Sequence, residues 1–221
     1  MPIALLSHKI DFDIINHVYK VDGRVIPHNT GILQDQGIVD LSGIPKERLD
    51  YKSALGTATH YAIHLHETNN LNEDSIHPAI ASHFKAYKKF CEVYRFEPRH
   101  TELMLYSKTW GFCTTLDLQG PFIWKKKEIE AIIEIKCTWA INPSNEIQTA
   151  AQQIAFEENY PDVKIKGRFG LQLKETENFE IIEYNNARDK NTFLSALTVY
   201  KWRADNKLIK KEKQHGNDRR E

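Results

Sequence analysis

GFCTTLDLQG at residues 111–120 and EAIIEIKCTW at residues 130–139 are two stretches rich in β-forming residues, with a short polar turn between them. TELMLYSK at residues 101–108 comes just before them and has the same character. Strands joined by short connections usually pair as antiparallel neighbours, so the three stretches predict a β-meander. We expect the rest of the fold to be built around it.

The two later strands bring charged side chains to one place. Side chains two residues apart in a strand point to the same face, so Glu134 and Lys136 project together and the isoleucines beside them project the other way. Asp117 lies between Leu116 and Leu118 and is expected on the face opposite these two leucines. If the strands pair as a hairpin, Asp117 meets Glu134.

Two converging carboxylates favour a metal site. They repel each other, and burial would push one toward protonation unless a divalent cation satisfied both. Mg²⁺ prefers oxygen ligands and keeps several waters, so it can bridge a phosphate and activate a nucleophile, while Lys136 could orient the attacking water. The alternative is a solvated strand face, because an Asp and a Glu-x-Lys also occur together by chance.

Amphipathic helices are predicted on both sides of the meander along the chain. Residues 52–67 have apolar side chains at helical spacing and carry His60, and residues 78–94 have a similar apolar stripe. Asn142 and Pro143 offer a cap and a first-turn proline to a helix that continues through residues 146–158.

The two ends of the chain add smaller elements. HVYKV and RVIPH flank Asp22-Gly23, which predicts a type I′ hairpin that decorates the core. Strands are predicted in residues 165–175 and 179–184, and Asp189 is expected to be the N-cap of a last helix.

Five of these segments, in order, resemble the RecB-like exonuclease branch of the PD-(D/E)XK nuclease superfamily, particularly its phage-type members. GTATH, which ends at His60, resembles the branch's G-T-x-x-H helix, and Glu102 resembles its upstream glutamate. GFCTTLDL resembles the strand that carries the metal-binding aspartate, here Asp117, and EIK at residues 134–136 supplies Glu-x-Lys. IQTAAQQIAFE resembles the Q-x-x-x-Y helix and places Gln148 at the site.

The match has two departures from the pattern. Thr114 stands where the strand motif has its second glycine, and Gln152 stands where the helix motif has tyrosine. The second departure leaves open whether Gln148 contacts substrate or organises the site.

The resemblance implies an α/β restriction-endonuclease-like core, with a central mixed β-sheet flanked by helices. It implies hydrolysis of DNA to 5′-phosphate products, by an exonuclease acting on DNA ends in recombination, repair or phage DNA processing. Mg²⁺ or Mn²⁺ would be held by His60, Asp117, Glu134 and the backbone carbonyl of Ile135. Lys136, Gln148 and Glu102 would complete the catalytic set, and a recombination or single-strand-binding protein is a possible partner.

Composition sets outer limits on these expectations. A chain of 221 residues with 30 basic and 30 acidic residues suits one globular domain whose DNA binding depends on local patches. We expect a nuclease domain at residues 1–205, with residues 1–50 as its hairpin decoration and residues 206–221 as a charged, disordered tail. The oligomeric state stays open.

The cysteine count and hydropathy suggest a compartment. Cys91, Cys113 and Cys137 are too few for the iron-sulfur cluster that some relatives carry, which needs four ligands, so no such cluster is expected. No segment approaches the ~20 apolar residues of a membrane span, and we expect a cytoplasmic protein without a membrane partner.

Other features keep two interpretations each. Lys125, Lys126 and Lys127 could contact DNA phosphates or simply form a solubilising turn. His60 and His64 have a spacing that can also bind zinc. Stacking on an unpaired base or ordinary packing are both open for the tryptophans of the meander, Trp110, Trp124 and Trp139. An endonuclease on the same fold, or a DNA-binding protein whose nuclease site has decayed, remains an alternative.

Overall fold

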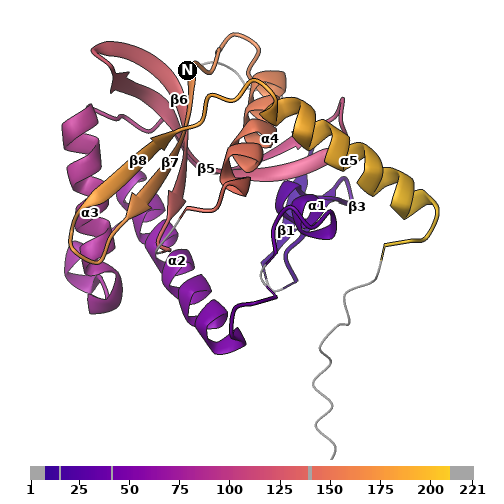
Figure 1. The fold of residues 1–221 in the computed structure, drawn as a ribbon. Coiled ribbons are helices and arrows are strands. Elements are labelled where there is room, and N and C mark those ends of the chain that lie inside the picture. The colour runs from indigo at the N-terminus through magenta and orange to yellow at the C-terminus, as the bar shows by residue number, and fades with distance from the viewer. Residues whose placement is uncertain (1–7, 15, 41, 139–140, 210–221) are drawn as a thin grey trace, which may run out of the picture.

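The computed structural model describes residues 8–14, 16–40, 42–138 and 141–209. Its centre is a five-stranded mixed sheet in the order β4-β5-β6-β7-β8, in which only the β6–β7 pair is parallel (Figure 1). This confirms the expected α/β class, with a central mixed sheet flanked by helices. The strands are β4 (His100–Ser107), β5 (Phe112–Trp124), β6 (Lys127–Lys136), β7 (Gly167–Leu173) and β8 (Phe179–Glu183).

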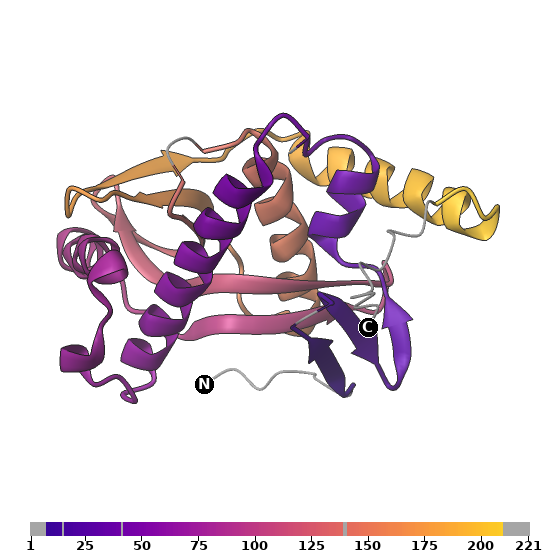
Figure 2. The same ribbon diagram turned by 90° about the horizontal axis from the view of Figure 1, so that it is seen from below.

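Helices cover both faces of this sheet, as the two ribbon views show (Figures 1 and 2). Side chains of two helices share one core cluster with β5, β6 and β7, and three other helices share a second cluster on the opposite face. The first pair is α2 (Lys46–Glu67) and α3 (Pro78–Tyr94), linked by the short 3-10 helix η1 (Glu73–Ser75); the second set is α1 (Asn29–Asp35), α4 (Ser144–Asn159) and α5 (Asp189–Asp205).

A separate three-stranded sheet lies at the N-terminal end of the described chain: β1 (Ile10–Asp13), β2 (Val18–Val21) and β3 (Arg24–Ile26). The turn between β2 and β3 has positive φ at Asp22 (48°) and Gly23 (80°), which confirms the predicted hairpin. Tyr19 of this sheet packs in one cluster with Cys113 of β5, so the small sheet contacts the β4–β5 pair where β4 ends and β5 begins (Figure 2).

Most predicted elements are present, with shifted ends. The helix predicted from residue 52 already begins at Lys46, and the helix after Asn142 begins at Ser144, whose N–H donates to the Asn142 side chain at 2.9 Å. Asp189 is the first residue of α5 and not its N-cap, which is Arg188, and its carboxylate is paired with the buried Arg168 at 2.6 Å. The expected disordered tail falls mainly on residues 210–221, which lie outside the described residues.

Within the described ranges, no helix is both long enough and apolar enough to cross a bilayer.

Candidate active site

Three carboxylates lie side by side on neighbouring strands. The β4–β5 register places Glu102 opposite Asp117, and the end of the β5–β6 ladder at Leu118 and Ile133 leaves Asp117 beside Glu134. Asp117 is 7% exposed and Glu134 2%, so their charges are largely removed from water. The sequence-based expectation that Asp117 meets Glu134 is therefore confirmed.

The strand alternation breaks at this row. Leu116 packs in the core beneath α4 and α5, whereas Leu118 packs in the core beneath α2 and α3, so the prediction that they share a face is wrong. Glu102, directly opposite on β4, has a left-handed φ of 49°, which is unusual inside a strand. The β5–β6 ladder stops just before the break, and the N–H of Ile135 instead donates to Asp117 Oδ2 at 2.7 Å.

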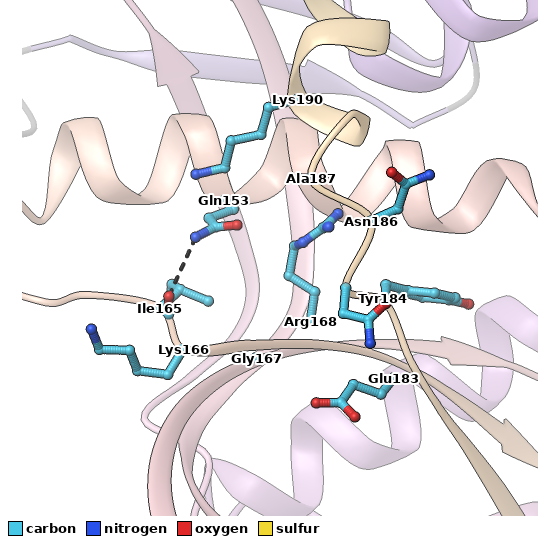
Figure 3. A pocket seen from close by; sticks show the side chains of 11 residues that line it. Gln153, Ile165, Lys166, Gly167, Arg168, Glu183, Tyr184, Asn186, Ala187 and Lys190 are labelled. Carbon is cyan, nitrogen blue, oxygen red and sulfur yellow. Dashed lines mark hydrogen bonds between the residues drawn. The ribbon is translucent and has the colours of Figure 1, made fainter.

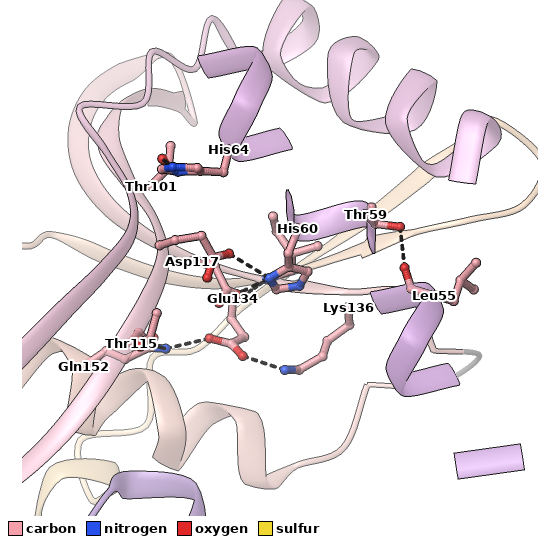
Figure 4. A network of polar contacts seen from close by, with 12 residues as sticks. Leu55, Thr59, His60, His64, Thr101, Thr115, Asp117, Glu134, Lys136 and Gln152 are labelled. Atoms are coloured by element: carbon pink, nitrogen blue, oxygen red, sulfur yellow. Dashed lines mark hydrogen bonds and ion pairs between the residues drawn. The ribbon is translucent and has the colours of Figure 1, made fainter. Parts of the chain in front are cut away.

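Helix α2 adds an imidazole to the acidic row. His60 Nδ1 lies 2.9 Å from Glu102 Oε1 and 3.7 Å from Asp117 Oδ1 (Figure 4). One ligand atom from each of these residues falls within 4.8 Å of the others, which is close enough for all three to hold one ion. An imidazole with two carboxylates suits Mn²⁺ or Mg²⁺ better than a thiolate-binding metal.

The electrostatics of the site also fit a cation. Burial, and then repulsion from Glu134, raise the pKa of Asp117 to about 8. Burial opposes a charge on His60, but Asp117 and Glu102 together raise the pKa of its imidazole to about 9. Without a metal, protons at this site offset the negative charge of its carboxylates. A bound divalent ion would supply that positive charge instead.

Glu134 is held by a separate set of donors. Its Oε1 accepts from Lys136 Nζ at 2.5 Å and from Gln148 Nε2 at 2.6 Å, and its Oε2 accepts from Gln152 Nε2 at 2.6 Å. The shared face predicted for Glu134 and Lys136 is confirmed. Burial opposes the charge on Lys136, but Glu134 and then Asp117 outweigh it and raise the ammonium pKa.

Gln152 is the residue that sequence reasoning missed. It stands where the Q-x-x-x-Y pattern has tyrosine, and its Nε2 also lies 3.1 Å from the carbonyl oxygen of Thr115 (Figure 4). Residues four apart share one helix face, so the spacing from Gln148 was the available signal. Both amides of α4 therefore fix the orientation of one carboxylate.

A cavity of about 720 Å³ opens over this arrangement. The central strands form its floor, α2 forms one wall and the N-terminal sheet forms another. The predicted site residue Glu134 is buried and does not line the cavity. Six others do line it: His60, Glu102, Asp117, Ile135, Lys136 and Gln148.

The predicted phosphate-binding lysines lie elsewhere. Trp124, the last residue of β5, is seven residues beyond Asp117, so the turn at Lys125 and Lys126 is roughly 23 Å away at about 3.3 Å per residue. Lys127 already belongs to β6, and Lys125 pairs with Glu183 at 2.7 Å. None of the three lines the cavity.

The tryptophans and the second histidine take other places. Trp124 stacks on Phe122, 5.6 Å between ring centroids, and neither it nor Trp110 lines the cavity, while Trp139 lies outside the described residues. His64 does line it, but its Nδ1 is 2.5 Å from Thr101 Oγ1, and it is not part of the metal-type cluster with His60.

A smaller cavity of about 330 Å³ lies between β7 and the start of α5 (Figure 3). Its buried cation, Arg168, is already committed to Asp189 and to the carbonyl oxygen of Glu146. No acid cluster of the metal-binding kind adjoins it in the described chain, so the larger cavity is the candidate active site.

Comparisons with known proteins add little. No family model matches the chain, and no curated protein matches it. Among solved structures, the chain is similar to a "Putative exonuclease" from Eubacterium rectale, with 11% sequence identity and a TM-score of 0.41, over 85% of this chain and 77% of that one.

Proposed function

We propose that this protein is a metal-dependent deoxyribonuclease that hydrolyses phosphodiester bonds in the larger cavity. The observation that carries the proposal is the row of Glu102, Asp117 and Glu134 on adjacent strands, with His60 above it and Lys136 beside it. Such a group is costly to bury without a cation, and the sequence motifs that supply it occur in the order found in the nucleases that the chain resembles.

His60, Asp117 and Glu134, with the carbonyl oxygen of Ile135, are the proposed metal ligands. Glu102 hydrogen-bonds His60 and lies in the same cluster, so it orients that imidazole or serves as a further ligand. A bound Mg²⁺ or Mn²⁺ would supply positive charge for the phosphate and would lower the pKa of a coordinated water.

The remaining residues act on position and charge. Lys136 has a raised pKa, so it stays protonated at neutral pH, where it donates to the attacking water or to a phosphate oxygen and does not act as a base. Gln148 and Gln152 hold the Glu134 carboxylate from α4 and thereby fix the place of Lys136. Water that attacks phosphorus in line with the O3′ leaving group would break the P–O3′ bond and leave a 5′-phosphate and a 3′-hydroxyl, as the resemblance implies.

We also propose that residues 1–205 form a single nuclease domain that works on DNA ends in the cytoplasm. A recombination or single-strand-binding protein is its proposed partner. Lys125, Lys126 and Lys127 would contact phosphates of the substrate well away from the cut, since they lie at the far end of the β5–β6 hairpin.

End-labelled linear DNA tests this proposal. The pure protein should release labelled product with Mg²⁺ or Mn²⁺, none with excess EDTA, and little with Ca²⁺, whose loose geometry suits binding better than turnover. Full cleavage in EDTA would disprove the metal mechanism. Stable DNA binding with no cleavage in either metal would instead identify a decayed nuclease.

A further inference from the structure

Part of the lining of the larger cavity is apolar and aromatic. Phe12, Ile14 and His17 of the N-terminal sheet region line it, and Tyr61 of α2, the neighbour of His60, lines it too. Ile14 is 73% exposed and Tyr61 62% exposed. Large apolar side chains gathered in one exposed pocket indicate a ligand surface.

A second, independent observation comes from Asn29, which also lines this cavity. Asn29 is 4% exposed, and within the described ranges its amide nitrogen has no hydrogen-bond partner. Buried amide donors are almost always paired, because leaving one unpaired is unfavourable. Because this nitrogen is itself shielded from solvent, an acceptor atom brought by a ligand would satisfy Asn29 once its side chain turns toward the cavity that it lines.

We propose that this apolar part of the lining, together with Asn29, forms a subsite for one unpaired nucleobase, which stacks on Tyr61 and accepts a hydrogen bond from Asn29. The inference rests on the proposed nuclease function, which places the phosphate of the same nucleotide at the carboxylate row. A nucleobase can make both contacts, because it has a flat π-face that can stack on Tyr61 and acceptor atoms on its edge that can bind the Asn29 amide.

The size of the cavity selects single-stranded over paired DNA. A volume of about 720 Å³ falls in the range of small-ligand pockets, roughly 300–1,000 Å³, so the cavity suits a single nucleotide. A base that enters the cavity and stacks on Tyr61 must first leave its pairing partner. Single-stranded ends, or ends that fray readily, are the substrates that this geometry favours.

Tyr61→Ala tests the stacking contact without disturbing the core, because the side chain is mostly exposed. Binding is measured on the full chain with Ca²⁺, using a short single-stranded oligonucleotide that carries fluorescent 2-aminopurine at its 5′ or its 3′ end and is checked to be intact afterwards. Base–aromatic stacking predicts an affinity loss of about 5- to 150-fold. Tyr61→Phe keeps the ring and should bind as the parent does.

Tyr51→Ala is the matched control. Tyr51 lies on the same helix, is 59% exposed and does not line the cavity, so its removal should change affinity less than twofold. An oligonucleotide with an abasic terminal residue should bind the parent more weakly, and Tyr61→Ala should weaken its binding no further, because the stacking partner is already gone.

Two outcomes would overturn the subsite: equal losses in Tyr61→Ala and Tyr51→Ala, or an undiminished loss in Tyr61→Ala with the abasic oligonucleotide. Asn29→Ala provides a second test, since it should weaken binding of the intact terminal base and leave binding of the abasic one unchanged. Because binding is measured without cleavage, a protein that passes these tests and cuts nothing with Mg²⁺ or Mn²⁺ refutes the nuclease and keeps the subsite. If Tyr61→Ala binds the oligonucleotide as tightly as the parent and still cuts DNA, the subsite alone is refuted.

Discussion

At the scale of single residues, Asp117 is the group on which the proposed chemistry depends. Its carboxylate joins the row of acids to His60, and it also closes the end of the β5–β6 ladder by accepting the Ile135 N–H. One side chain thus serves both the sheet and the proposed metal.

Asp117→Asn separates these two duties, because asparagine can still accept from Ile135 but binds a cation poorly. We expect a loss of cleavage of more than ~100-fold, exceeding the 10–100-fold that is usual for residues supporting a ligand. DNA binding should persist. Near-parental cleavage by Asp117→Asn and by Glu134→Gln would refute the site, and Glu128→Gln, an exposed acid on β6, is the control that should cut normally.

We also expect the stability of Asp117→Asn to depend on pH differently from that of the parent. The pKa of Asp117 is about 8 in the metal-free folded protein, against an ordinary value of 3.8, so between these pH values the folded state keeps a proton that the unfolded chain has lost. The Asp117 contribution to stability therefore falls as pH rises from about 4 to about 8. Metal-free Asp117→Asn should melt higher than the parent at pH 8 by a few degrees, with a smaller gap at pH 5; about 1 kcal/mol corresponds to about 2–4 °C at this chain length. A lower melting temperature at pH 8 would contradict the burial argument.

Metal binding should be coupled to proton release. Burial and Glu134 favour a proton on Asp117, while the carboxylates of Asp117 and Glu102 favour one on His60, so this pair holds at least one proton at pH 7 that must leave when an ion binds. Each released proton makes the apparent affinity for Mn²⁺ rise ~10-fold per pH unit, so binding should tighten from pH 6 toward pH 9. Calorimetry in buffers of different ionisation enthalpy counts the protons. Binding that is independent of pH would contradict the assignment of these ligands.

At the scale of elements, the site depends on a break in the regular alternation of side chains along β5. β4 and β5 run past each other in constant register, yet Leu116 and Leu118 point into opposite cores and Glu102 takes a left-handed φ. Strict alternation would have placed Asp117 fully on one face. The break instead leaves it between β4 and β6, in reach of both Glu102 and Glu134.

A histidine at the start of the short helix α1 gives the stability of the protein a second dependence on pH. His28 is its N-cap and accepts from the Gly31 N–H at 3.2 Å, while burial and then the neighbouring His17 lower the pKa of its imidazole to about 4. With an ordinary value of 6.5, the unfolded chain binds a proton between pH 6.5 and pH 4 that the folded protein excludes. The stability contribution is complete above pH 6.5 and is lost as pH falls to about 4.

His28→Asn isolates this effect, since asparagine is a good N-cap that does not titrate. The parent should lose about 1–3 kcal/mol more than His28→Asn between pH 7 and pH 4.5, as measured by urea unfolding. The variant's own curve supplies the loss due to all other groups. Parallel curves for the two proteins would show that His28 is free to protonate when folded.

At the scale of the whole molecule, α2 and the N-terminal sheet enclose the carboxylate row from two sides. Phe12, Tyr19 and His17 face α2 across the cavity, and the central sheet closes its floor. We therefore expect a strand to enter lengthwise, between α2 and the N-terminal sheet, when it brings a phosphate to the floor.

This enclosure predicts a preference for ends. With Mg²⁺ or Mn²⁺ at low salt, linear plasmid DNA should shorten progressively, while the covalently closed circle of the same plasmid should resist. Raising the salt should slow digestion, because the lysines that hold phosphates act through screened charges. A nicked circle serves as an internal control for access through a break. Rapid linearisation of the closed circle would leave an endonuclease on the same chemistry.

The sequence by itself determined the meander, the helices on each side of it and the shared face of Glu134 and Lys136. These features follow from two- and 3.6-residue periodicities and from turn residues, which act within short windows of the chain. The pairing of Asp117 with Glu134 also follows, because a tight hairpin fixes its own register. Predicted roles for these residues remain proposals for the experiments above.

Only the tertiary structure decided the other half of the site. Gln152 matters because α4 lies over β6, and Tyr61, Phe12 and Asn29 share a cavity although they come from a helix, a small sheet and another helix. The place of the turn lysines, far from the carboxylates, was decided in the same way by the length of β5. Contacts of this kind depend on how whole elements pack, through many weak interactions summed over residues distant in sequence, and no local pattern encodes them.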